Sequence, residues 1–135
     1  MPLDPVDHLE ILNLLARYVH AIDLGTPEQW ADCFTDDAEF DARPVTHCRT
    51  RAELIEFCTL VAGNTRHWTS NAWIEGDGQR ATARSFLLSL RPGRSPQPGP
   101  TAVYHDRLRK TPDGWRIEYR KVAFEEPPDW PNPVT

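Results

Sequence analysis

The pattern of apolar and polar positions separates a helical first half of the chain from a second half with the alternation of β-strands. Apolar side chains recur at helical spacing from Ile11 to Ile22, which predicts a helix with one wide apolar face. Asp4 is a typical N-cap for this helix, and Gly25 is placed to end it in the left-handed conformation.

Two capping-box motifs predict two further helices. Thr26 to Gln29 opens a short helix that carries Trp30 and Phe34 to the core. Thr50 to Glu53 opens the next helix, which we expect to end at Gly63.

The second half is expected to form two β-hairpins. The first turns at Gly76-Asp77-Gly78 and the second at Asp113-Gly114, both of which are strong hairpin signals. The strands are expected at residues 67–75, 80–90, 101–110 and 115–124, with a further short strand at residues 38–42. Residues 91–100 contain four prolines, so we expect an exposed, mobile loop there.

Helices followed by antiparallel hairpins are typical of an α+β domain, with helices on one face of a curved, mostly antiparallel sheet. Such a sheet has a concave interior in which a pocket can form. Residues 1–126 are expected to form this single domain, and residues 127–135 a proline-rich C-terminal tail. We expect the tail, which contains Trp130, to fold over the pocket mouth or onto a neighbouring molecule.

Composition narrows the classes of partner. The net charge of −5 and the absence of a basic run argue against a nucleic-acid surface. No run of 18 apolar residues is present, so we expect no membrane span, and the first residues do not form a secretory signal. The three cysteines lack metal or redox spacing, which predicts reduced thiols in a cytoplasmic protein. Glycine-rich phosphate loops are absent as well, so we expect neither a metal nor an organic cofactor.

Three polar residues stand where folding alone does not require them. Tyr18 and Asp23 lie near the end of the first helix, and His67 begins an aromatic strand. Imidazole titrates near neutral pH, so His67 could take a proton from a carbon next to a carbonyl. Asp23 could orient the ring, and the Tyr18 hydroxyl could donate a hydrogen bond to the developing enolate.

Further side chains are expected to line the pocket. If His67 points inward, strand alternation brings two residues of the same strand with it. The expected substrate-binding residues are Asn71, Trp73, Tyr104, Phe34 and Phe40. For Tyr18, Tyr104 and the phenylalanines, packing in the core is the competing interpretation.

Several blocks of the sequence resemble one known family. They include Ala21-Ile22-Asp23, Ile74-Glu75-Gly76-Asp77-Gly78 and Asp113-Gly114-Trp115-Arg116-Ile117. In order and spacing, the chain is similar to the SnoaL-like branch of the nuclear transport factor two-like superfamily. Members of this group include scytalone dehydratase, a bile-acid dehydratase, polyketide cyclases and ketosteroid isomerases.

The resemblance implies a cone-shaped α+β barrel, a homodimer formed through the open sheet face, and a set of site residues. Asp23 and His67 look like the aspartate–histidine pair of the dehydratases. Tyr18, five residues before Asp23, matches the phenol of the bile-acid dehydratase pattern. Residues 84–91 lack the second histidine of scytalone dehydratase, so the particular reaction of that enzyme does not carry over.

We therefore expect a cofactor-independent acid–base enzyme, a dehydratase-type lyase or an isomerase or cyclase. Its substrate would be a hydroxylated carbonyl compound such as a polyketide, steroid or aromatic intermediate. The alternative is a non-catalytic small-molecule-binding or assembly module of the same fold. A third possibility is a pericyclic cyclase or an epoxide hydrolase; the latter needs several carboxylates around one water, and only Asp23 and Asp106 are candidates to point inward.

Overall fold

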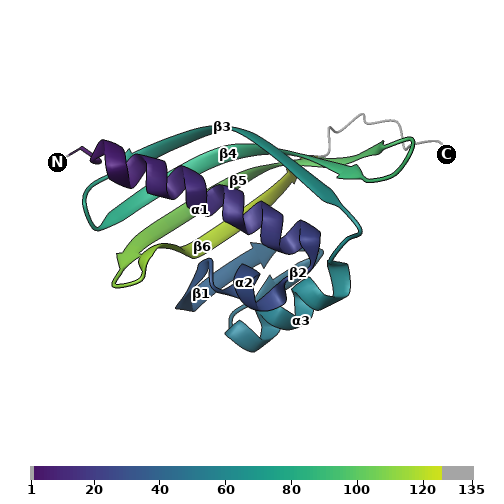
Figure 1. Ribbon diagram of the computed structural model, residues 1–135, viewed down its shortest axis with the longest axis horizontal. Helices are drawn as coiled ribbons and strands as arrows, with labels where there is room; N and C mark the ends of the chain where they lie inside the picture. The colour runs from purple at the N-terminus through teal and green to yellow at the C-terminus, as the bar shows by residue number, and fades with distance from the viewer. Residues whose placement is uncertain (1, 126–135) are drawn as a thin grey trace.

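The computed structural model describes residues 2–125, in which three helices cover one side of a six-stranded sheet (Figure 1). The helices are α1 (Pro5–Leu24), α2 (Pro27–Ala31) and α3 (Arg51–Val61). The strands are β1 (Phe34–Ala42), β2 (Thr46–Cys48), β3 (Arg66–Gly76), β4 (Arg80–Arg91), β5 (Gln97–Thr111) and β6 (Gly114–Glu125). This arrangement confirms the predicted α+β class.

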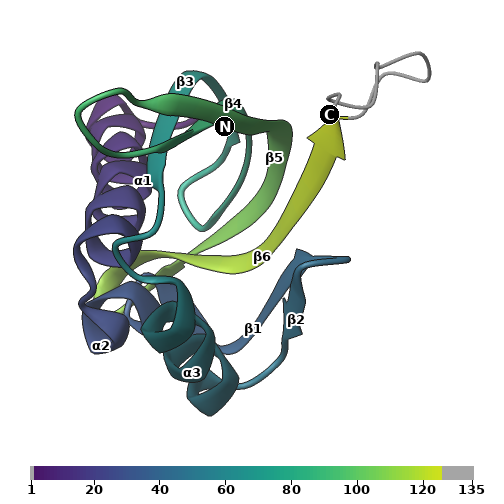
Figure 2. The same ribbon diagram turned by 90° about the vertical axis from the view of Figure 1, so that its right-hand side faces the viewer.

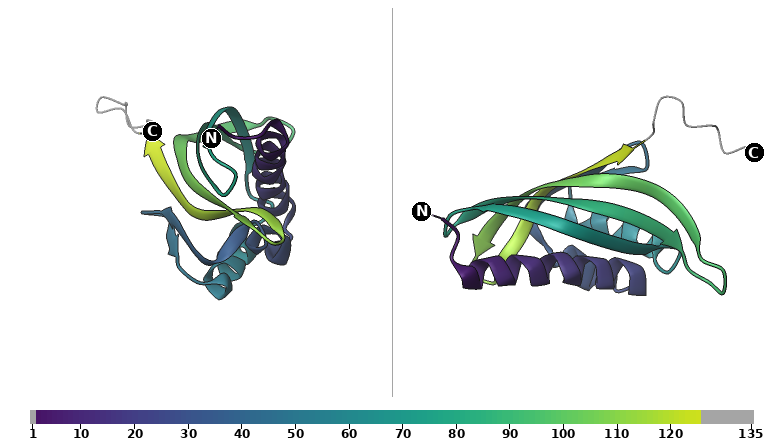
Figure 3. Two further views of the ribbon diagram at one scale, coloured as in Figure 1. Left: turned by 90° about the vertical axis from the view of Figure 1, so that its left-hand side faces the viewer. Right: turned by 90° about the horizontal axis from the view of Figure 1, so that it is seen from above.

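The sheet has the strand order β2-β1-β6-β5-β4-β3 and is strongly curved (Figure 2). All neighbouring strands pair antiparallel except β1 and β6, which pair in parallel. Helix α1 runs along the concave face (Figure 3), while α2 and α3 lie beside β1 and β2. The concave face and the helices therefore enclose the core, and the opposite, outer face of the sheet is left uncovered by helices.

The predicted helix ends are mostly confirmed. The Asp4 carboxylate accepts a hydrogen bond from the Val6 amide at 2.7 Å, and Gly25 ends α1 at a φ of 78°. The Thr50 hydroxyl caps α3 by accepting a bond from the Glu53 amide at 3.1 Å. The capping box at Thr26 was wrong, because that side chain caps no amide of α2.

Two parts of the β structure differ from the prediction. Strand β1 begins at Phe34, earlier than expected, and pairs with β2, which the sequence did not indicate. Strand β5 begins at Gln97, so the predicted loop shrinks to residues 92–96. Prolines are tolerated at the start of β5 because this segment pairs only with β4, and β6 joins it from Thr101 onward.

Strand β3 contains a bulge that changes which side chains face the core. Ser70 pairs with Phe86 and Trp73 with Arg84, so Asn71 and Ala72 lie together opposite a single residue of β4. Asn71 has a φ of 58°, in the left-handed region that asparagine tolerates better than most residues. Beyond the bulge, the alternation of β3 is shifted by one residue.

The core consists of apolar side chains from all three helices and the concave face of the sheet. Aromatic rings from Tyr18, Trp30, Phe34 and Phe40 pack within 5.1–6.5 Å of one another. Within residues 2–125, no helix combines the length and apolar character needed to cross a membrane. The predicted tail from Pro127 to Thr135 lies outside the described residues.

Candidate active site

Asp23 and His67 form a hydrogen-bonded pair on the concave side of the sheet. Asp23 Oδ1 lies 2.5 Å from His67 Nδ1, and Asp23 Oδ2 accepts a bond from the His67 backbone amide at 2.7 Å. Both carboxylate oxygens are therefore engaged by one residue, and the carboxylate cannot rotate without breaking a bond. An ionised Asp23 places the proton of a neutral imidazole on Nδ1, which leaves the Nε2 lone pair available.

The end of α1 explains how Asp23 and Tyr18 can both point inward. Five residues rotate by about 140° in a regular helix, so the two side chains leave α1 in different directions. Asp23 lies in the last turn of α1, where its carboxylate bonds to His67 at the start of β3. Tyr18 lies more than one turn earlier and is buried in the core. Both are buried, at 5% and 1% exposure.

A cavity of about 200 Å³ adjoins the pair. Its polar lining comes from Tyr18, Asp23, Thr65, His67, Ser89 and Tyr104. The remaining lining residues are apolar: Ile22, Phe40, Ala42, Val45, Phe57, Val61, Leu87, Pro100, Val122 and Phe124. The lining thus combines polar groups with aromatic and aliphatic side chains.

Behind the two tyrosines lies a buried ion pair. Arg120 donates two hydrogen bonds to Asp106, from Nε at 2.7 Å and from Nη2 at 2.8 Å. Its guanidinium stacks 4.2 Å from the ring centroid of Tyr18 and 3.9 Å from that of Tyr104. Asp106 is therefore held by Arg120 and is not available as a second base beside the cavity.

The environment of the tyrosines keeps their hydroxyls protonated. Burial raises the pKa of Tyr18 to about 12, although the Arg120 guanidinium acts in the opposite direction. Burial likewise raises the pKa of Tyr104 well above its ordinary value. At neutral pH both groups are hydrogen-bond donors and neither is a base.

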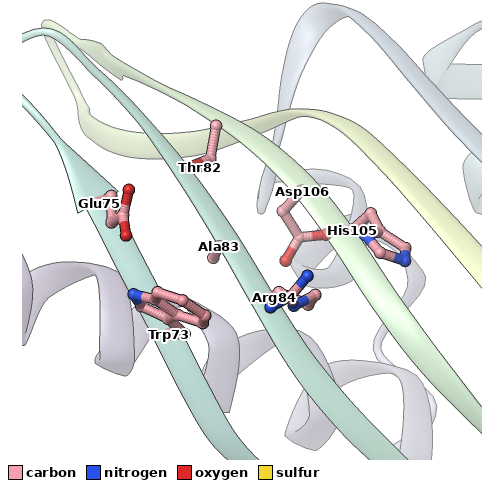
Figure 4. Close-up of a pocket in the computed structure, with 7 residues that line it drawn as sticks. All are labelled: Trp73, Glu75, Thr82, Ala83, Arg84, His105 and Asp106. Carbon is pink, nitrogen blue, oxygen red and sulfur yellow. The ribbon is translucent and has the colours of Figure 1, made fainter.

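Three of the expected pocket residues lie elsewhere. Because of the bulge, Trp73 points to the outer face, where it is 60% exposed and Arg84 stacks against it (Figure 4). Asn71 sits at the bulge and lines a separate hollow between α1 and β3. Phe34 packs in the core against Trp30 without reaching the cavity, whereas Phe40 and Tyr104 do line it.

Other lining residues were missed because they come from distant segments. Ser89 faces the cavity because it pairs directly with His67 across β3 and β4. Alternation within β4 indicates an inward face for Ser89, but only the register between the strands shows that it lies beside His67. Arg120 was missed as well, because nothing in its own strand signals a buried cation.

One group of side chains resembles a metal site in its spacing. Donor atoms of Glu39, Asp41 and His47 lie within 4.8 Å of one another. However, Arg43 donates to both carboxylate oxygens of Asp41, and this lowers the pKa of that carboxyl. Asp41 is thus already paired with a cation of the protein, and His47 Nε2 lies 2.6 Å from Glu39 Oε2, so these three residues do not fit a metal ion well.

A helix-covered, curved sheet with an Asp–His pair facing an internal cavity defines a small α+β protein with a ligand-sized interior. A family model described as "SnoaL-like domain" matches residues 6–121, and the chain belongs to this family.

Individual proteins are similar to this chain in sequence or in fold. The small subunit of anthranilate 1,2-dioxygenase from Burkholderia cepacia is 25% identical over 86% of this chain and 85% of the relative. A protein of unknown function from Mycobacterium tuberculosis superposes with a TM-score of 0.86, at 31% identity, over 97% of this chain and 84% of that one. A candidate scytalone dehydratase from Novosphingobium aromaticivorans has a TM-score of 0.77 at 22% identity, over 90% and 85%, which shows a shared fold.

Proposed function

We propose that the chain is a cofactor-independent enzyme that removes a proton next to a carbonyl group and eliminates water from a hydroxylated carbonyl compound. The observation that carries the proposal is the Asp23–His67 pair, joined by two hydrogen bonds and facing a cavity with two protonated tyrosines. Core packing alone does not explain an aspartate and a histidine that share a cavity with phenol groups.

Each residue has a distinct role in the proposed reaction. His67 Nε2 takes the proton from the carbon next to the carbonyl, and Asp23 stabilises the positive charge that the imidazole acquires. Tyr18 or Tyr104 donates a hydrogen bond to the enolate oxygen. The bond between the β-carbon and its hydroxyl oxygen then breaks. His67 transfers its proton to this oxygen, so the leaving group departs as water.

A surrogate substrate can test this chemistry without knowledge of the natural one. Dehydration of 4-hydroxy-4-phenylbutan-2-one gives water and 4-phenylbut-3-en-2-one, whose conjugated product is followed by ultraviolet absorbance. The wild type should accelerate the reaction, and His67→Ala should lose about a hundredfold or more of that acceleration. Asp23→Asn should also be impaired, because its amide can donate to the ring and favour the wrong tautomer.

His105→Ala is the matched control, because His105 is an exposed histidine on the outer face of the sheet. It should retain wild-type turnover. Equal rates for His67→Ala and the wild type would refute the proposed chemistry.

A second candidate function, a non-catalytic assembly module, is favoured by one comparison: the relative from B. cepacia is a small subunit of an oxygenase. Under this alternative, the Asp23–His67 pair would contribute only to packing, and its variants would alter stability without any effect on turnover. The surrogate assay distinguishes the two candidates directly.

We also propose that the outer face of the sheet mediates homodimer formation. Large apolar side chains are exposed there: Trp68 (64%), Trp73 (60%), Phe86 (51%) and Leu88 (38%). Patches of this kind are typical of protein interfaces. Light scattering should show a dimer that Phe86→Glu dissociates and Leu60→Glu, on the exposed side of α3, does not.

A further inference from the structure

We infer that the cavity beside Asp23 and His67 selects an uncharged compound with a single ring, and rejects both aromatic carboxylates and four-ring steroids. This inference rests on the proposed function, since it names the class of substrate that the same site would accept. It narrows the range expected from the sequence, which included steroids. Three separate observations support the inference: the volume of the cavity, the aromatic residues in its wall and the charges of its lining.

The volume of the cavity limits the size of the ligand. Drug-sized ligands occupy pockets of about 300–1,000 Å³, and an apolar cavity of about 150 Å³ is large enough for benzene. At about 200 Å³, this cavity has room for one ring with a short polar substituent. A rigid four-ring skeleton would leave most of its apolar surface outside the mouth beside Val45, which is itself 60% exposed.

The walls favour a ring over a flexible chain. Phe40, Phe57 and Phe124 contribute aromatic faces, and Phe40 and Phe57 lie 5.9 Å apart between ring centroids. Aromatic ligands gain from offset or edge contacts with such rings in addition to the burial of apolar area. Tyr18, a polar lining residue, lies 6.5 Å from Phe40 between ring centroids, so a ring packed on the phenylalanines could carry its carbonyl group close to a phenol.

Charge excludes a carboxylate. Among residues 2–125, the lining of the cavity contains no lysine or arginine. The positive charge of Arg120 is neutralised by Asp106 and lies behind the faces of Tyr18 and Tyr104. Residues 126–135 contain Glu126 and Asp129 and no basic residue, so that segment supplies no positive charge either.

An anionic ligand would therefore lose its hydration and meet the carboxylate of Asp23, while the nearby Arg66, which is not part of the lining, donates to the backbone oxygens of Asp23 and Thr65 at 3.3 and 3.2 Å. A ketone has no such cost, because its oxygen accepts a hydrogen bond from a tyrosine hydroxyl. The difference in binding free energy between the ketone and the carboxylate should be large, since like charges repel one another strongly at a site with little water.

Two ligands of nearly identical shape test the charge argument. 4-Phenylbutan-2-one and 3-phenylpropanoate differ by a methyl group in place of a carboxylate oxygen. Titration calorimetry with the wild type should show the carboxylate binding about tenfold or more weakly than the ketone. Estrone, a four-ring neutral ketone, tests the size argument and should not displace 4-phenylbutan-2-one.

A gain-of-affinity variant makes the test independent of loss of folding. Val45 lines the cavity and is 60% exposed, so Val45→Lys can place an ammonium group at the mouth without being buried. This variant should improve the affinity for 3-phenylpropanoate relative to that for the ketone by about threefold or more. Val6→Lys, at 62% exposure on α1, is the matched control and should change neither affinity.

Three results would overturn the inference: carboxylate binding within about twofold of the ketone, tight binding of estrone, or no binding of the ketone. Failure of the proposed function would look different. In that case the ketone would still bind best, but His67→Ala would dehydrate the surrogate as fast as the wild type. Conversely, turnover that depends on His67 together with equal binding of the carboxylate would sustain the chemistry and refute the selectivity.

Discussion

Replacement of Arg120 by methionine tests what holds the tyrosines of the cavity in place. The side chains of Arg120 and Asp106 are 2% and 0% exposed, and two hydrogen bonds of 2.7 and 2.8 Å join them. Arg120→Met leaves a carboxylate buried without its partner, which costs about 3–5 kcal/mol in other proteins. Loss of the two stacking contacts to the tyrosines adds to this, by up to about 2 kcal/mol each.

The free energy of unfolding should therefore fall by at least about 3 kcal/mol, a large share of the 5–15 kcal/mol that is typical of single domains. Urea denaturation followed by circular dichroism measures this change as a drop of about 2 M in the midpoint. The double variant Asp106→Leu with Arg120→Met should recover much of the loss, because neither charge then remains buried.

Arg51→Met is the control, since Arg51 forms a bond of similar length, 2.8 Å, with Asp32 on the surface. At 47% and 62% exposure, that pair should contribute less than about 1 kcal/mol. The reasoning fails if Arg120→Met costs as little as Arg51→Met, or if the double variant is no more stable than the single one.

Three further outcomes follow from local contacts. Thr50→Ala should cost about 1 kcal/mol in urea denaturation because its hydroxyl caps α3, whereas Thr26→Ala should cost less because Thr26 caps no amide. At the bulge, Asn71→Gly should leave stability nearly unchanged, while Asn71→Val should cost about 1–3 kcal/mol because a β-branched residue is strained at a positive φ. Hydrogen bonds, first from Trp115, lower the pKa of Asp7 from 3.8, so its stabilising effect should be complete above that value and disappear as the pH falls below it. Denaturation midpoints measured between pH 2 and pH 6, with Asp7→Asn as reference, check the sign.

The sequence predicts the helices and hairpins well where local chemistry decides the conformation. Asp4, Gly25 and the Thr50 cap act within one turn of their helix, and each acts in the structure as expected. Strand β2 was missed because three residues carry too little periodicity to be recognised, even though only three residues separate it from its partner β1. The start of β5 was missed because proline normally excludes a strand, and only its position at the sheet edge makes it acceptable.

The bulge in β3 shows most clearly what a single sequence cannot specify. Strict alternation from His67 predicts Trp73 on the same face, and one extra residue at Asn71 reverses that prediction. Asn71 is a weak signal, because asparagine is rare in regular strands and tolerates a positive φ, but it does not by itself specify a bulge. Because of the bulge, Trp73 lies on the surface that we propose as a dimer interface and not in the pocket wall, where it was expected.

Asp23 illustrates why the Asp23–His67 pair could be anticipated when much of the cavity wall could not. A carboxylate near the C-terminus of a helix is opposed by the helix dipole, at a cost of about 0.3–1 kcal/mol, so its presence there asks for a compensating partner. The structure provides that partner, since the backbone amide and the ring of His67 both bond to the carboxylate. The same dipole end and the same carboxylate stabilise the positive charge that the imidazole of His67 acquires when it takes a proton. An arrangement that is unfavourable for the helix alone is thus favourable for a histidine that acts as a base.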